Sequence, residues 1–218
     1  MDRVEMKARA RQLIARNRAR AVLAPLVPMT LYVLLYGLPL FGFIMTRDPS
    51  FLFIAIAVAV VFIPLMVGLA NFFMQFEKDP KASYGAVWKG YRKENLLRSL
   101  GRLLQMFVFI YAWSIFLVFP GVIKSLAYAM TPFILADDDF KDSKHDPITL
   151  SRAMMNGHKV EFFVLLLSFI GWMVLGIFTF HVLTVLFVTP YFYQTLALFY
   201  QKVKADYNVK VGLVKNTG

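Results

Sequence analysis

The chain has 218 residues, of which 59% are hydrophobic, and its formal net charge at pH 7 is +11. Soluble domains are about 45–50% apolar, so this composition excludes a soluble protein. The absence of cysteine also excludes disulfide frameworks, thiolate metal sites and cysteine nucleophiles.

The chain begins with a basic segment, residues 1–20, that has the pattern of an amphipathic helix. From about Arg3 to Arg16, apolar residues such as Leu13 and Ile14 recur at helical spacing among arginines. We expect this helix to lie on the inner face of a membrane, with its apolar side chains dipping toward the acyl chains and its arginines at lipid phosphates. The arginines that we single out for a lipid or partner contact are Arg9, Arg11, Arg16, Arg18 and Arg20.

Long charge-free runs follow, and their lengths predict membrane spans. A hydrocarbon core of about 30 Å takes about 20 helical residues. Between Glu161 and Lys202 no charged residue occurs for 40 residues, which is enough for two spans joined by a turn near His181. We predict one membrane domain over residues 21–204 and a tail over residues 205–218. The six spans are expected at about residues 21–45, 51–75, 103–120, 121–136, 161–180 and 182–201.

The positions of the basic residues indicate the orientation of these spans. All but two of the 24 Lys and Arg residues lie before Ala21, from Lys78 to Arg102, from Lys141 to Lys159, or after Gln201. Short loops rich in Lys and Arg stay in the cytoplasm, so we expect both termini and both long loops there. This placement explains the net charge without a nucleic-acid partner.

The spans are expected to form three hairpins, each preceded by an inner amphipathic helix, in an all-α polytopic membrane bundle. The second such helix should cover about Tyr84 to Leu97, and the third should begin at Asp146, an N-cap followed by proline. Three copies of one unit explain this pattern, although proline is in any case common in membrane helices. The structural prolines are Pro64, Pro132 and Pro190, one in the second helix of each hairpin, and Pro120, at the turn of the middle hairpin.

Lys124 is the one charged residue within an otherwise apolar stretch. An intramembrane ionisable group is a functional-site hypothesis, here for a lipid phosphate or a partner carboxylate. Lys124 lies close to Pro120 at the predicted outer surface, however, so its side chain can also snorkel to the interface. We favour the second interpretation.

Acidic residues cluster after the fourth predicted span, and hard cations bind such oxygen ligands. The spacing matches no calcium loop, so we interpret the cluster as a solvated loop whose last member caps the following helix. The sequence contains no recognisable catalytic pattern, and we predict no catalytic residue, no metal site and no cofactor. The cluster consists of Asp137, Asp138, Asp139, Asp142 and Asp146.

Several motifs between Phe119 and Lys202 carry a family resemblance. Together with MKARARQLIARN from Met6, they resemble a family of bacterial integral membrane proteins catalogued as domain of unknown function 975. The resemblance implies a multi-span protein of the bacterial plasma membrane, and it brings no established activity, cofactor or catalytic residue. Lys124 and Asp137 lie within the motifs. The motifs are PGVIK from Pro120, YAMTPFILAD from Tyr128, SRAMMNGHKVEFF from Ser151 and LSFIGW from Leu167.

We therefore expect a non-enzymatic membrane protein that binds lipid, mainly anionic lipid of the inner leaflet, or a membrane protein partner, which includes a second copy of itself. A role in envelope maintenance or in protection from membrane-active agents would suit it. The alternative is a small transporter or transporter subunit with a polar site near the midplane. A cavity lined by Asn71, Gln105 and Gln194 would favour that alternative, whereas hydrogen bonding between helices is the more common role of such residues.

Overall fold

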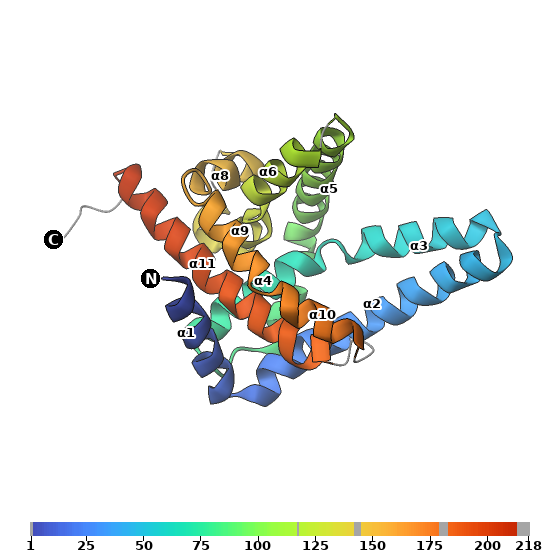
Figure 1. Cartoon of the computed structure of the whole chain (residues 1–218), viewed down its shortest axis with the longest axis horizontal. Coiled ribbons are helices and arrows are strands. Elements are labelled where there is room, and N and C mark those ends of the chain that lie inside the picture. Colours follow the sequence, from blue (N-terminus) through green and yellow to red (C-terminus); the bar gives the residue numbers. More distant parts are fainter. Residues whose placement is uncertain (1, 117, 142–144, 179–182, 213–218) are drawn as a thin grey trace.

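The computed structural model describes residues 2–116, 118–141, 145–178 and 183–212, and these ranges contain helices and no strand (Figure 1). The elements are α1 (Arg3–Arg16), α2 (Arg18–Thr46), α3 (Pro49–Phe62), α4 (Leu65–Lys78), the 3₁₀ helix η1 (Tyr84–Tyr91), α5 (Lys93–Phe116), α6 (Val118–Tyr128), α7 (Thr131–Ala136), the 3₁₀ helix η2 (Asp138–Phe140), α8 (Pro147–Met154), α9 (Lys159–Leu167), α10 (Ile170–Phe178), the π-helical turn η3 (Thr184–Val188) and α11 (Thr189–Lys210).

Three helices that begin at a proline, α4, α7 and α11, form the core. Pro64 is the N-cap of α4, while Pro132 and Pro190 lie in the first turns of α7 and α11. Proline is tolerated at these positions because the first N–H groups of a helix have no intrahelical acceptor. Each of these helices therefore starts at a break in the apolar segment that contains it.

Aromatic side chains join the three core helices. Phe73 of α4 stacks on Tyr193 of α11 with ring centroids 5.7 Å apart. Phe133 of α7 stacks on Tyr200 of α11 at 5.5 Å. Offset and stacked aromatic pairs of this kind add to the free energy gained from burial alone.

A short element packs on each core helix, in an order shifted by one along the chain. η1 packs on α4, α8 packs on α7, and α1, from the start of the chain, packs on α11. η1 and α8 thus each cover the core helix that comes just before them in the chain. α1 has no core helix before it, and it covers the last one, α11.

Pairs of longer helices project from this core. α2 packs along α3 and α5 packs along α6, and Figure 1 shows these two pairs pointing away from the body in different directions, with α1 and the C-terminal part of α11 on the side opposite the α2–α3 pair. Among the described residues, three helical stretches are long and apolar enough to cross a membrane, and a shorter apolar stretch covers Pro120–Ala136. The three are Arg18–Thr46, Pro49–Lys78 and Lys159–Gly176.

The first expected amphipathic helix forms with the predicted bounds, but its apolar face lies elsewhere than expected. Asp2 and Glu5 form a capping box at the start of α1. Met6, Ala10 and Leu13 are buried in the protein core, against α11 among other elements. The prediction that Leu13 dips toward lipid is therefore wrong, because α11 offers a closer apolar surface.

The prediction of one amphipathic helix from Tyr84 to Leu97 is wrong, because this segment is divided between two elements. The structure has the 3₁₀ helix η1, an extended Arg92, and then the start of α5. η1 lies so close to α4 that a Cβ on Gly68 would come within 1.6 Å of the Val87 carbonyl oxygen. This backbone contact holds η1 in a geometry that the helical spacing of its apolar residues does not reveal.

The turn expected at Pro120 and Gly121 is also misplaced. α5 extends to Phe116, and both residues lie in the first turn of α6. Gly121 faces α5, where a Cβ would meet the Ser114 hydroxyl oxygen at 2.2 Å. Proline is acceptable there because the first helical turn needs no N–H donor, so Pro120 starts a helix rather than reversing the chain.

Side chains from the short elements satisfy backbone carbonyls that the helix breaks leave free. The Tyr91 hydroxyl of η1 donates to the Val61 carbonyl, 3.0 Å away, just before the break at Pro64. The Ser151 hydroxyl of α8 donates to the Ala127 carbonyl at 2.9 Å, at the end of α6. The expected continuous span over 121–136 is thus two helices, α6 and α7, held across their junction by α8. The turn expected at His181 lies outside the described residues.

Candidate functional site

Two lysines hold the acidic run at the C-terminal end of α7. Lys89 of η1 donates hydrogen bonds to the Ala136 carbonyl at 2.7 Å and to Asp138 Oδ1 at 2.8 Å. Lys204 of α11 contacts Asp137 Oδ2 and Asp139 Oδ2, both at 2.5 Å. We call these residues the Asp–Lys cluster: Lys89, Asp137, Asp138, Asp139 and Lys204.

The charges of the cluster stabilise one another. Burial alone would lower the pKa of Lys204, but its hydrogen bonds to Asp137 and Asp139 raise that pKa above the ordinary value. The hydrogen bond from Lys204 lowers the pKa of Asp139. Lys204 and Asp139 are therefore both charged near neutral pH.

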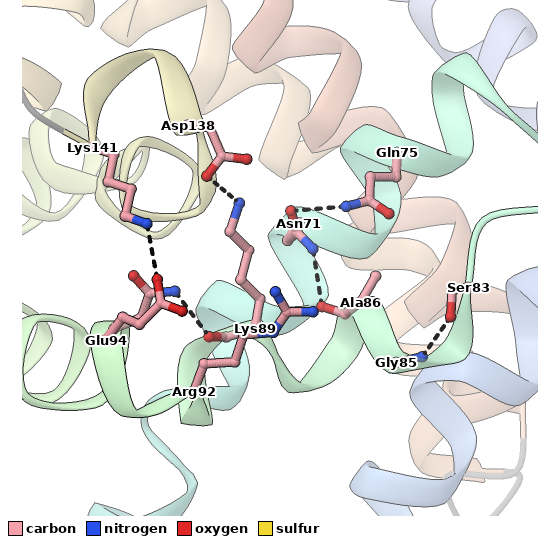
Figure 2. Close-up of a pocket in the computed structure, with 11 residues that line it drawn as sticks. Asn71, Gln75, Ser83, Gly85, Ala86, Lys89, Arg92, Glu94, Asp138 and Lys141 are labelled. Carbon is pink, nitrogen blue, oxygen red and sulfur yellow. Dashed lines mark hydrogen bonds and ion pairs between the residues drawn. The ribbon is translucent and has the colours of Figure 1, made fainter.

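Two small polar cavities flank the cluster, and Asn71, Gln75 and Asp138 line both. Figure 2 shows the larger, of about 240 Å³, with Lys89 reaching across it to Asp138 and with the Asn71 amide bonded to the Ala86 carbonyl at 3.0 Å. The smaller is about 170 Å³ and includes Lys204. Carboxylates and cations share these walls, so the cavities suit water and small polar groups rather than an apolar ligand.

The interpretation of the acidic residues as a solvated loop holds for the largely exposed side chains of Asp138 and Asp139, and it is wrong for Asp137. The Asp137 side chain is only 12% exposed and is paired with Lys204, because α11 brings its cation to the end of α7. Asp146 does cap the following helix, as expected, by accepting from the Thr149 N–H at 3.1 Å, and it also pairs with Arg102. Asp142 lies outside the described residues.

A larger cavity lies between the α1–α2 junction and the segment from α10 to α11. Its volume is about 570 Å³, and apolar side chains make up most of its wall. We call it the arginine groove, and the residues that define it are Arg11, Arg18, Val22, Trp172, Phe187 and Tyr191.

The charged end of the arginine groove comes from the N-terminal segment. Arg11 lies over the Tyr191 ring, with its guanidinium carbon 5.2 Å from the ring centroid. Tyr191 is 8% exposed, and its hydroxyl lies beside Arg11 but has no hydrogen-bond acceptor within the described residues. The groove thus combines two cations, a hydroxyl without an acceptor and an apolar wall.

The other predicted arginines lie outside the groove. Arg9 is 3.6 Å from Glu77, and Arg20 donates to the carbonyls of Lys81 and Ala82. Arg16 is exposed at the end of α1. Two of the predicted contact arginines therefore bind the protein itself, while Arg11 and Arg18 come together in one cavity.

Lys124 lies on the α5–α6 pair, far along the chain from the groove. Its ammonium is 4.7 Å from the centroid of the Trp113 ring. This cation–π contact gives Lys124 an intramolecular partner, as an anchoring side chain would have.

Polar residues that were candidates for a permeation path do not converge. Asn71 lines both small cavities, whereas Gln105 accepts a hydrogen bond from Arg102 and lines neither. Gln194 is fully buried in α11 and also lines neither cavity.

Sequence reasoning did not find Lys89, Tyr200 and Lys204 as partners of the acidic run. Tyr200 is fully buried and donates to Asp137 Oδ2 at 2.7 Å. Asp137 and Lys204 are 67 residues apart in the sequence. The only available signal was the charge balance between the Asp run and lysines on other elements, which does not identify pairs.

No curated protein and no solved structure matches the chain. The expected family resemblance between Phe119 and Lys202 is confirmed by a family model that extends the match toward the N-terminus, although the segment from Met6 to Asn17 lies outside it. That model, described as a protein of unknown function (DUF975), matches residues 52–207, and the chain belongs to this family.

Proposed function

We propose that the protein is a non-enzymatic, multi-pass protein of the plasma membrane that binds anionic lipid of the inner leaflet or a membrane partner. Six crossings form three hairpins, and both termini and the Asp–Lys cluster are on the cytoplasmic side. Envelope maintenance, or protection of the membrane from membrane-active agents, is the cellular role that fits such a protein.

The observation that carries this proposal is the apolar surface of the projecting helices. Only 22% of an 18-residue apolar stretch of α2 is buried inside the protein. Large side chains such as Leu38, Phe53 and Ile115 are 67%, 70% and 67% exposed. Monomeric soluble proteins rarely expose contiguous apolar surface of this extent, whereas lipid tails cover it without cost.

The arrangement of charge supports the proposed orientation. α1 and the C-terminal half of α11 lie on the side of the molecule opposite the α2–α3 pair (Figure 1), and Lys204 of the Asp–Lys cluster belongs to that half of α11. Basic residues are retained on the cytoplasmic side of short loops and attract anionic lipid there. The serial packing of η1, α8 and α1 on α4, α7 and α11 supports three related units.

The proposal is tested by membrane extraction followed by native mass spectrometry. The protein should stay in the membrane pellet at alkaline pH, and in detergent with mixed lipid it should retain anionic phospholipid in preference to zwitterionic phospholipid. Release at alkaline pH would contradict the membrane assignment, and equal retention of the two lipids would contradict the lipid preference. Co-purification of a stoichiometric membrane protein in place of lipid would favour the partner-binding form of the proposal.

A further inference from the structure

The arginine groove has the shape and polarity of a site for one amphipathic molecule. Its volume of about 570 Å³ lies within the range of about 300–1,000 Å³ for small-molecule sites. Arg11 lies on α1 and Arg18 at the start of α2, while Trp172 and Phe187 come from α10 and η3. Ile14 and Val22, on the same helices as the arginines, add to the apolar wall, so the groove combines a cationic part with an apolar part.

We propose that this groove holds a single phospholipid with an anionic headgroup, whose phosphate binds Arg11 and Arg18 and whose acyl chain covers the apolar wall. The inference rests on the proposed function, because only a membrane protein has this ligand in its surroundings. It adds a defined site to the general attraction of basic segments for the inner leaflet.

The positive charge of the groove indicates that its ligand carries an anionic phosphate. Arg11 has no carboxylate partner among the described residues, and its guanidinium instead covers the face of Tyr191. A guanidinium binds phosphate through paired N–H donors, which an aromatic face does not replace. A phosphate oxygen there would also give the buried Tyr191 hydroxyl the acceptor that it lacks.

Arg11 and Arg18 differ from the neighbouring arginines in being available to an anionic ligand. Arg9 and Arg20 are near other groups of the protein, Glu77 and the carbonyls of Lys81 and Ala82. The two arginines of the groove are exposed, and both line the same cavity. A helix from another protein would cover the apolar wall equally well, but would leave both guanidinium groups without an anion.

The test compares two double variants with the same loss of charge. Arg11→Gln with Arg18→Gln removes the charged end of the groove, and Arg3→Gln with Arg16→Gln removes two exposed arginines of α1 outside it. Native mass spectrometry measures binding of a phosphatidylglycerol titrated into detergent. The groove variant should bind about 30-fold more weakly, since each charge near the headgroup contributes about one factor of five. The matched control should change less than about threefold, as screened surface charges do.

A third variant tests the apolar part of the site. Ala15 is exposed and lines the groove, so Ala15→Trp fills its apolar part and leaves both arginines in place. This variant should also lose the lipid, and excess inorganic phosphate should not displace lipid from the wild type. A thermal melt of each variant identifies any that fails to fold. If Ala15→Trp does not fold, the comparison of the two arginine double variants still tests the site.

The outcomes separate the site from the general function. Equal loss of lipid in the two double variants overturns the groove as a site, while the anionic preference of the proposed function stands. Displacement by inorganic phosphate overturns the acyl-chain contact. A wild type without any anionic preference overturns both the groove and the proposed lipid binding.

Discussion

The hydroxyl of Tyr200 on α11 donates a 2.7 Å hydrogen bond to Asp137 Oδ2 at the end of α7. The same carboxylate oxygen accepts from Lys204, one helical turn further along α11. Tyr200 also stacks on Phe133 of α7, so that a polar and an apolar contact fix the same pair of helices. This junction joins α7 to α11 at the end of the core that we propose to be cytoplasmic.

Asp137→Asn should therefore destabilise the protein by about 3 kcal/mol, because it leaves the largely buried Lys204 with one exposed partner. Asp139→Asn is the matched control, since Asp139 lies at the same distance of 2.5 Å from Lys204 but its side chain is 73% exposed. It should cost less than about 1 kcal/mol. Unfolding of both variants in detergent, followed by circular dichroism, measures the difference, and equal losses would contradict the role of Asp137.

The same cluster predicts the pH dependence of stability. The pKa of Asp139 is lowered from 3.8 in the folded state, so its contribution is present above that value and is lost as the pH falls through the folded pKa. The pKa of Lys204 is raised from 10.5, so its contribution is present below that value and is lost as the pH rises through the folded pKa. Between these limits the cluster gives a plateau.

Thermal unfolding in detergent across the pH range measures both limits. Asp139→Asn should have a slightly lower plateau, because the contribution of Asp139 is missing there, and a smaller loss of stability than the wild type at the acid end. An acid limb that is identical in the two proteins would show that Asp139 does not contribute to it.

Ser151 should be important for the junction between α6 and α7. Its hydroxyl accepts from the Met130 N–H at 3.2 Å and donates to the Ala127 carbonyl at 2.9 Å, and the residue is fully buried. Ser151→Ala leaves two buried backbone groups unsatisfied and should cost about 2 kcal/mol.

Ser125→Ala is the control for Ser151→Ala. The Ser125 hydroxyl donates only to the Val122 carbonyl of its own helix, at 2.7 Å, so its loss should have little effect. Hydrogen exchange at the Met130 amide should accelerate in Ser151→Ala alone. Unchanged exchange there would contradict the bridging role.

Local signals in the sequence predicted individual helices well. α1 has the expected bounds because Asp2 and Glu5 form its capping box, and α8 starts as expected because Asp146 caps it before a proline. These signals act within a few residues, so they are visible in a single sequence.

Features that depend on contacts between distant elements were not predictable in this way. η1 is a 3₁₀ helix where it lies against Gly68 of α4, and a Cβ on Gly90 would come within 2.1 Å of the Pro64 carbonyl oxygen. The pairing of Lys89 with Asp138 spans 49 residues. The arginines were selected from the sequence as a group, but only the fold separates Arg11 and Arg18, which share a cavity, from Arg9 and Arg20.

The membrane topology is the central claim, and single cysteines test it directly because the chain has none of its own. Ser50→Cys, at the start of α3, should react in intact cells with a maleimide that does not cross membranes. Ser83→Cys, before η1, and Asn156→Cys, after α8, should react only after the membrane is permeabilised. All three positions are exposed in the fold, so access depends on the side of the membrane. Labelling of Ser83→Cys or Asn156→Cys in intact cells would contradict three transmembrane hairpins connected by cytoplasmic loops.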